Sequence, residues 1–151
     1  MIRMIKERKA DFSNDRYFLS NFYPSVILVE GISFSSVEQY YQWSKCATQQ
    51  GKDLILYART PGQMKRLGKQ VIIKKDWEQI KEAVMYKGVK AKFSQNPELK
   101  ALLLATGTEE LAEGNNWGDT FWGVNYYTRE GQNKLGKILM KVREEINNGK
   151  K

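Results

Sequence analysis

The chain has 151 residues, of which 41% are apolar and 12% aromatic, so it can bury a core without metal or disulfide support. It contains 25 Lys and Arg against 17 Asp and Glu, which gives a formal charge of +8, and it has one Cys and no His. The lack of histidine excludes Ser–His–Asp and Cys–His nucleophile pairs, His-ligated zinc sites and imidazole general bases. Acid–base chemistry must therefore come from carboxylates, Lys, Tyr or Cys46.

Cysteine use and hydropathy predict a soluble, cytoplasmic protein. One cysteine cannot form an internal disulfide, which is typical of a reducing compartment. The charged start lacks the apolar stretch of a signal peptide, and the longest aliphatic run, residues 101–105, is far shorter than the ~20 residues that span a bilayer. With no repeat or linker in the sequence, we expect one domain over residues 1–151.

Positive charge is concentrated in the middle of the chain. Residues 64–92 hold nine Lys and Arg against three Asp and Glu, so this segment supplies +6 of the total charge. A phosphate-bearing partner is one explanation, and a solvated helix face is the other. Composition alone leaves the two evenly balanced.

The first half of the chain predicts a hairpin followed by helices. Residues 26–29 and 32–34 flank Glu30-Gly31 and predict a short hairpin with Gly at the turn. Ser35 and Ser36 can cap a helix over about residues 36–50, whose inward face is expected to carry Val37, Tyr40, Tyr41 and Ser44. Thr60-Pro61 predicts the start of a short helix that ends near Gly68.

Three further helices are predicted in the second half. The first starts at Asp76, with Gln79 placed as in a capping box, and is expected to align Trp77, Ile80, Val84 and Ala91 on one side. The second starts at Asn96-Pro97, stops at Gly107 and is expected to bury Leu99, Leu102 and Leu103. The third runs over about residues 133–146 and is expected to bury Leu135, Ile138, Leu139, Val142 and Ile146. Together these elements predict an α+β class, mostly helical, with a small antiparallel sheet.

The helix after the hairpin carries the first candidate site. Glu38, Tyr41, Gln42 and Lys45 are three, four and seven residues apart, so a carboxylate, a phenol, an amide and an ammonium share one helix face. A purely structural alternative is equally supported, because Ser35-x-x-Glu38 is itself a capping-box pattern and Glu38 could simply cap its helix.

The irregular segment 107–132, rich in Gly and aromatic residues, carries the second candidate site. Within residues 115–125, Asp119 is flanked by tryptophans and glycines, which suits a wall against a planar ligand because aromatic faces stack on bases. The alternative is a tight turn in which the tryptophans plug the core and Asp119 accepts hydrogen bonds from local amides.

Two weaker signals are assigned to structure. Cys46 lies beside Lys45, which could lower its pKa, but a small core residue is the preferred interpretation. Residues 131–137 spell most of a phosphate-loop pattern, yet Ile138 follows where Ser or Thr is required, so we assign them to a helix start.

Several blocks of the sequence resemble the YbiA-like, or NADAR, superfamily of N-glycosidases. The resemblance covers about residues 12–146, and its blocks are 18–24, 36–45, 76–85, 92–99, 103–107, 119–123 and 132–140. Many members have His at the position of Gln39, which we interpret as a supportive position. Some have an acidic residue where this chain has Val124-Asn125, a difference that bears on substrate identity more than on reaction type.

The resemblance implies a YbiA-like fold and hydrolysis of an N-glycosidic bond. The family's acidic helix residue and the following lysine correspond to Glu38 and Lys45, and its late Asp-x-x-Trp-Gly motif corresponds to Asp119, Trp122 and Gly123. Its tryptophan after the basic stretch corresponds to Trp77, and its Ser-Asn-Phe loop to Ser20, Asn21 and Phe22.

Cleavage of a ribosyl C–N bond passes through an oxocarbenium-like state, so we assign roles by charge. Asp119 would stabilise the cation and Glu38 would hold water or sugar hydroxyls, although these two roles can be exchanged. Lys45, Asn21 or backbone amides would serve the leaving base, and Trp122 or Trp77 would stack it together with Phe22. Arg66, with Lys65 and Lys69, would hold phosphate. This scheme requires no metal or redox cofactor.

Three functions remain open from the sequence. The first is removal of ADP-ribose from guanine bases of nucleic acid or nucleotides, which the basic middle segment slightly favours. The second is cleavage of ribosylamino-pyrimidine phosphates of riboflavin synthesis. The third is a non-catalytic module that binds ADP-ribose or nucleic acid, whose binding would weaken steeply with salt and release no base.

Overall fold

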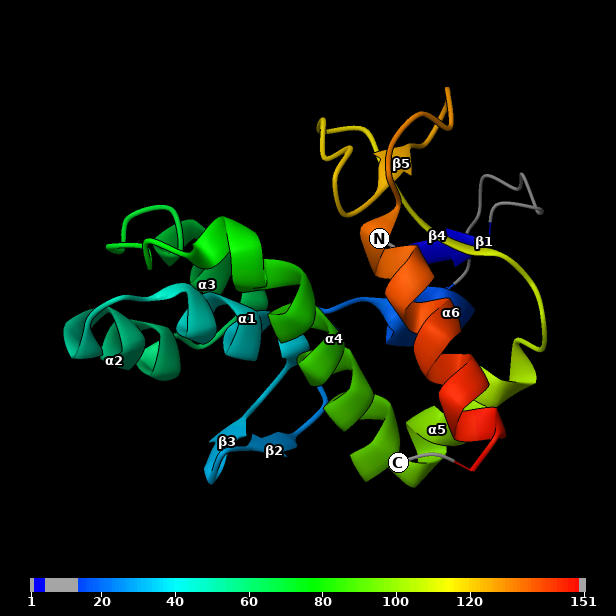
Figure 1. Ribbon diagram of the computed structural model, residues 1–151, viewed down its shortest axis with the longest axis horizontal. Helices are drawn as coiled ribbons and strands as arrows, with labels where there is room; N and C mark the ends of the chain where they lie inside the picture. Colours follow the sequence, from blue (N-terminus) through cyan, green and yellow to red (C-terminus); the bar gives the residue numbers. More distant parts are fainter. Residues whose placement is uncertain (1, 5–13, 150–151) are drawn as a thin grey trace. The chain divides into compact units, whose positions relative to one another are not determined.

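The computed structural model describes residues 2–4 and 14–149, and the chain divides into two compact units (Figure 1). One unit consists of residues 21–96 and the other of the segments before and after it. The described part of the chain has six α-helices and short strands, which confirms the α+β class with a small antiparallel sheet. One domain over residues 1–151 stays a prediction.

The unit of residues 21–96 begins with the predicted hairpin. Strands β2 (Ile27–Val29) and β3 (Ile32–Phe34) pair antiparallel, with Ile27 opposite Phe34 and Val29 opposite Ile32. The turn residues Glu30 and Gly31 have φ of 53° and 80°, so both adopt the left-handed conformation of a type I′ turn. A tight turn of this kind fixes the strand register, which turns Ile27, Val29 and Phe34 into the core.

Helix α1 (Val37–Lys45) is shorter than predicted, and α2 (Gln49–Tyr57) follows as a separate helix. Cys46 is extended, with φ −73° and ψ 130°, and it forms an antiparallel bridge with Ile73. The N–H of Ala47 donates to the carbonyl of Ile72 at 2.8 Å. The chain therefore leaves the helix because a distant segment offers its backbone other partners, and Thr48 then caps α2.

Helices α3 (Pro61–Leu67) and α4 (Trp77–Gln95) complete this unit. The Thr60 cap, the following Pro and the stop at Gly68 are as predicted. The capping box at Asp76 is wrong, because the Asp76 side chain makes no cap hydrogen bond. The predicted apolar side of α4 is also shifted: Ile80, Val84 and Ala91 are only half-buried, and the buried positions are Trp77, Met85, Gly88, Val89, Lys92 and Phe93.

Packing of α4 against α1 and the hairpin orders the core of this unit. A Cβ at Gly88 would lie 2.8 Å from the Tyr40 ring, so glycine is needed for the two helices to approach. At the other end, the side chain of Gln95 donates to the Leu28 carbonyl at 2.9 Å and accepts from the Leu28 N–H at 2.8 Å. Asn96 donates to the Val26 carbonyl at 3.2 Å. The end of α4 is thus fastened along β2.

The other unit joins short strands to two helices. Strand β4 (Leu111–Asn115) pairs antiparallel with β1 (Ile2–Met4) and parallel with β5 (Val124–Asn125), and η1 (Asn14–Leu19) is a 3-10 helix. Helix α5 (Pro97–Ala105) buries Leu99 and Leu103, but Leu102 is 45% exposed, contrary to the prediction. Helix α6 (Lys134–Asn147) buries the predicted apolar residues, except that Ile138 is half-buried.

The start of α6 is tied to β4 by one side chain. Asn133 has φ 51°, and its amide accepts from the Glu113 N–H at 3.1 Å and donates to the Leu111 carbonyl at 3.0 Å. Residues 131–137 therefore form a helix start, as the sequence indicated. None of the helices in the described ranges is long and apolar enough to cross a membrane.

Candidate functional site

Glu38 does not cap its helix. The N-cap of α1 is Ser36, whose Oγ accepts from the Gln39 N–H at 3.1 Å. The Gln39 side chain returns to accept from the Ser35 N–H at 2.8 Å. Ser36 and Gln39 therefore carry out the capping that Ser35 and Glu38 were predicted to share, and Gln39 is supportive, as interpreted from the sequence. The Glu38 carboxylate is available for another role.

The Glu38 side chain is buried and held by its own helix. It is 7% exposed, and its Oε2 accepts from the Gln42 Nε2 at 2.8 Å, which confirms that residues 38 and 42 share a helix face. Burial raises the pKa of Glu38 above its ordinary value of 4.5, and the Gln42 hydrogen bond and the charges of Lys65 and Lys45 oppose this shift. Desolvation wins, so Glu38 is a stronger base than an exposed carboxylate.

Lysines from three helices of this unit act on the same region. Lys45 ends α1, Lys65 lies on α3, and Lys81 lies on α4. Burial lowers the pKa of Lys45; the carboxylate of Glu38 opposes that shift, and the positive charges of Lys69 and Lys81 add to it. A lysine with a lowered pKa gives up its proton more readily, so Lys45 suits an acid catalyst.

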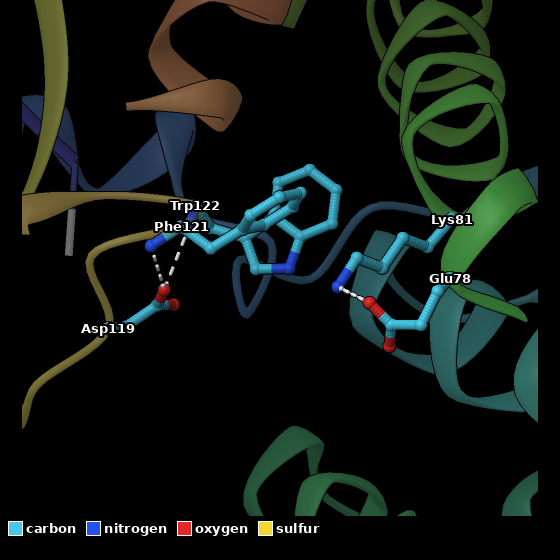
Figure 2. A network of polar contacts seen from close by, with 5 residues as sticks. All are labelled: Glu78, Lys81, Asp119, Phe121 and Trp122. Carbon is cyan, nitrogen blue, oxygen red and sulfur yellow. Dashed lines mark hydrogen bonds and ion pairs between the residues drawn. The ribbon is translucent and has the colours of Figure 1, made fainter. Parts of the chain in front are cut away.

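Lys81 also pairs with an acidic residue one turn away. Its Nζ lies 2.6 Å from Oε1 of Glu78, and the pair belongs to the first turns of α4 (Figure 2). The Lys81 side chain is 16% exposed whereas that of Glu78 is 74% exposed. The Lys81 side chain is therefore buried against the protein, whereas the Glu78 carboxylate that it pairs with faces water.

Aromatic side chains line this part of the unit. Trp77 is buried and contacts Tyr41 edge to face, with ring centroids 5.0 Å apart. Phe22 is half-buried beneath the Lys65 ammonium, which lies 6.0 Å from its ring centroid. Asn21 donates to the Met85 sulfur at 3.3 Å, and its carbonyl accepts from the Glu38 N–H at 3.1 Å. Asn21 thus joins the loop before the hairpin to α1.

Arg66 lies in the last turn of α3 and is exposed, beside Lys65 and three residues before Lys69. Its position is consistent with the predicted source of positive charge for a phosphate. The structure therefore brings Glu38, Lys45, Asn21, Phe22, Trp77 and the basic residues of α3 into one unit, the one that carries most of the positive charge.

The second candidate site is a tight turn in the other unit. One oxygen of Asp119, Oδ1, accepts from the Phe121 N–H at 3.1 Å and from the Trp122 N–H at 2.9 Å (Figure 2). Asn115 braces the turn, because its Oδ1 accepts from the Asp119 N–H at 3.1 Å and its Nδ2 donates to the Asp119 carbonyl at 2.9 Å. Among the described residues, no donor reaches Oδ2 of Asp119.

The alternative of a tight turn is thus correct for Asp119, which accepts hydrogen bonds from local amides. It is wrong for the tryptophans, which do not plug the core. Trp117 is 57% exposed, and Trp122 is half-buried with its ring edge to face with Phe121 at 4.8 Å. Gly123 is buried where a Cβ would lie 2.9 Å from Asn115 Nδ2. A fixed carboxylate beside a partly open indole remains chemically suited to a planar or cationic ligand.

The contacts of Ser20 and Cys46 are structural. Ser20 follows η1, is half-buried and donates its N–H to the Tyr17 carbonyl at 2.9 Å. Cys46 is fully buried and donates to the Gln42 carbonyl at 3.3 Å, and burial raises the pKa of its thiol, so the core interpretation is confirmed and an activated thiol is wrong.

The sequence assigned no chemical role to Gln42 or Lys81. Gln42 was recognised as part of the helix stripe, but spacing gives no indication that its amide bonds Glu38 in a buried environment. Lys81 lies within the basic segment, where many lysines look alike. For residue 39, the difference between His in many family members and Gln in this chain was the indication of a supportive role, and Gln39 takes part in capping α1.

The comparisons with known proteins agree with one another. The NADAR domain family matches residues 7–147. The chain is 36% identical to N-glycosidase YbiA of Escherichia coli K12 over 89% of this chain and 84% of that protein. It is 37% identical to an N-glycosidase of Nostoc punctiforme, over 85% of each chain.

A longer relative and a solved structure add to this. The chain is 42% identical to a riboflavin biosynthesis protein of Vibrio vulnificus over 85% of its own length, which is 35% of that protein. The NMR structure of E. coli YbiA is similar with a TM-score of 0.80 and 33% identity, covering 95% of this chain and 83% of that one. The predicted fold family is confirmed.

Proposed function

This chain belongs to the NADAR family and is an N-glycosyl hydrolase, and we propose that it removes ADP-ribose from guanine bases of nucleic acid or nucleotides. The observation that carries the proposal is the group of lysines near the buried Glu38, with Lys45 on α1, Lys65 on α3 and Lys81 on α4. ADP-ribose brings a pyrophosphate with two negative charges, and lysines on separate helices can bind both phosphates. Exposed Arg66 extends the same positive surface.

In the proposed reaction, the bond between the ribose carbon and the base nitrogen breaks while positive charge grows on the sugar. Asp119 is our candidate for stabilising that charge, because its carboxylate is fixed by two backbone amides through one oxygen. The stabilisation needs no reorganisation during the reaction. Trp122 would stack against the base or sugar from the neighbouring position.

Proton transfer is assigned to Glu38 and Lys45. Glu38, whose pKa burial raises, takes a proton from the attacking water. Lys45, whose pKa burial lowers, donates a proton to the departing base. Asn21 and Phe22 would contact the base or sugar beside them, and Trp77 would support Tyr41 behind the same helix face. Ser20 and Gly123 are proposed to shape the loops that contact the substrate.

A second substrate class is favoured by the names of two relatives. The riboflavin biosynthesis proteins of Vibrio vulnificus and Zea mays are 42% and 35% identical to this chain. Ribosylamino-pyrimidine phosphates would present the same kind of C–N bond with one phosphate in place of two. The same acid, base and carboxylate roles apply, and the lysine cluster would then hold a single phosphate.

A comparison of the two substrate classes tests the proposal. The protein is incubated with an oligonucleotide that carries ADP-ribose on guanine, and separately with ribosylamino-pyrimidine phosphates, and products are separated by chromatography. We expect free ADP-ribose and intact guanine oligonucleotide at a higher kcat/KM than release from the pyrimidine phosphates. The opposite ratio would assign the protein to the second class, and binding of the oligonucleotide without release would contradict the proposed activity on it.

A further inference from the structure

Within the described residues, the side chain that hydrogen-bonds the Glu38 carboxylate is that of Gln42, which is itself buried. It is 5% exposed and lies one helical turn after Glu38 on α1. Its Nε2 donates to Oε2 of Glu38 at 2.8 Å, while no donor in the described part of the chain reaches its Oε1. A buried amide oxygen without a partner costs free energy, so this arrangement needs an explanation.

The orphan oxygen lies against a glycine that leaves room for it. Gly68, the residue that ends α3, is buried, and a Cβ there would lie 2.6 Å from Cδ of Gln42 and still closer to its Oε1. Gly68 has φ −60° and ψ −19°, a helical conformation that any residue can adopt. Space for the Gln42 amide, and not backbone conformation, therefore requires glycine at this position.

An amide suits a carboxyl group that changes its protonation state. When Glu38 is ionised, the amide N–H is its donor, as the structure has it. When Glu38 carries a proton, half a turn of the amide would present Oε1, which can accept from the carboxylic O–H. The Gln42 amide can therefore hydrogen-bond the Glu38 carboxyl group in either protonation state.

We propose that Gln42 is a positioning residue for the reaction, and that Gly68 provides the space its amide needs to hold the Glu38 carboxyl group in both of its protonation states. This inference rests on the proposed role of Glu38 in proton transfer. Other charged groups face Glu38 as well: Lys45 on α1 and Lys65 on α3, with Lys69 and Lys81 acting through Lys45. A substitution at residue 42 removes none of these charged side chains.

The test compares the Glu38 carboxyl group in two proteins, independently of turnover. The side-chain carbons of glutamate are labelled with ¹³C, the Glu38 signal is assigned from its loss in Glu38→Gln, and its titration is followed in wild type and Gln42→Met. Methionine keeps the shape and removes both hydrogen-bonding groups. We expect the pKa of Glu38 to rise by about one unit, because a hydrogen bond to the charged form is lost.

Kinetics give a second readout. We expect Gln42→Met to lower kcat about tenfold, with KM within about twofold and the pH at which kcat reaches half its maximum shifted upward. Ser44→Ala is the matched control, because Ser44 is buried on the same helix and bonds the Tyr40 carbonyl at 2.8 Å instead of Glu38. It should leave the Glu38 titration and the pH profile unchanged.

Two more variants keep the test decisive. Gln42→Glu places a second carboxyl beside Glu38 and should raise the pKa of Glu38 at least as far as Gln42→Met does. Gly68→Ala should shift it in the same direction, because the methyl group displaces the amide. An unchanged Glu38 titration in both residue-42 variants would overturn the positioning role, and an unchanged titration in Gly68→Ala alone would overturn the role of Gly68.

Failure of the proposed function would look different. If wild type released no base from either substrate class, the role of Glu38 in catalysis would be refuted. A shifted Glu38 titration in Gln42→Met would then still establish that Gln42 holds the carboxyl group, and an unshifted one would refute that as well.

Discussion

Ser36 and Gln39 cap α1 reciprocally with Ser35: the Ser36 hydroxyl accepts from the Gln39 N–H at 3.1 Å, and the Gln39 side chain accepts from the Ser35 N–H at 2.8 Å. The first turn of the helix is therefore satisfied without any acidic side chain. Because of this, Glu38, the second residue of α1, can be buried with its carboxylate directed to Gln42. Capping and candidate chemistry are separated onto adjacent residues.

Ser36→Ala should lower the free energy of unfolding by about 1 kcal/mol, because it removes the N-cap acceptor of α1. Urea unfolding at pH 7 measures the change. Turnover, measured well below the unfolding transition, should stay close to wild type. If Glu38→Gln instead shows this stability loss and Ser36→Ala does not, Glu38 is the capping residue after all.

Glu38→Gln should reduce kcat by at least about 100-fold, the scale of a lost general base. Its effect on stability should depend on pH. Burial raises the pKa of Glu38 in the folded protein above its ordinary value of 4.5. Between that ordinary value and the raised pKa, the native chain binds more protons than the unfolded chain, so wild-type stability falls as pH rises. Glutamine does not titrate, so the stability of the variant relative to wild type should increase from about pH 4 toward neutral.

Urea unfolding at several pH values measures that increase, and Glu98→Gln, an exposed glutamate of α5, serves as the control. The same stability difference at every pH would contradict a buried, destabilised carboxylate at residue 38. Near-normal turnover of Glu38→Gln would contradict its role as the base.

Asp119→Asn should lower turnover at least about 100-fold with a nearly unchanged melting temperature, because the Asn Oδ1 can still accept from the Phe121 and Trp122 amides while the negative charge is lost. Asp119→Ala also loses the oxygen that accepts both hydrogen bonds. It should therefore also unfold more easily, by roughly 1–2 kcal/mol. Steady-state kinetics and thermal melts of the pair separate charge from turn structure, and near-wild-type turnover in Asp119→Asn would refute the assignment.

Lys92→Met should stabilise the protein at pH 7 and lose that advantage in alkali. Burial lowers the pKa of Lys92 from 10.5 to about 7. Between those values the unfolded chain binds more protons than the native chain, so wild-type stability rises with pH across this window. Methionine removes the penalty, which at 1.36 kcal/mol per pKa unit is roughly 5 kcal/mol at most below pH 7. Urea unfolding between pH 6 and 10 measures it.

The exposed Lys100→Met is the matched control and should show no such pH dependence. A gain in stability for Lys92→Met that stays constant from pH 6 to 10 would mean that Lys92 keeps its proton in the folded protein.

Features that depend on neighbouring residues were predictable from the sequence. The hairpin turn at Glu30-Gly31 and the Thr60-Pro61 helix start each follow from the conformational preferences of two or three adjacent residues. Most of the buried side of α6 followed as well, because its apolar residues repeat with a clear helical period.

Features that depend on residues distant in the sequence could not be predicted from it. The end of α1 at Lys45 depends on backbone pairing with residues 72–74, which no local pattern around Cys46 reveals. Whether Glu38 caps its helix or is a buried carboxylate depended on which of two adjacent serines is the N-cap of α1. Leu102 lies in a run of three leucines, where periodicity cannot say which one faces solvent.

The amide side chains at the end of α4 have a consequence for how copies of this protein meet. Gln95 bonds both backbone groups of Leu28, in the way that a neighbouring strand would, and Asn96 occupies the Val26 carbonyl. This edge of β2 would otherwise offer unpaired groups next to Val26 and Leu28, which are 65% and 58% exposed. The side chains of Gln95 and Asn96 thus take the place of a neighbouring strand along β2, so this edge of the hairpin offers another chain no free backbone group of Leu28 on which to add.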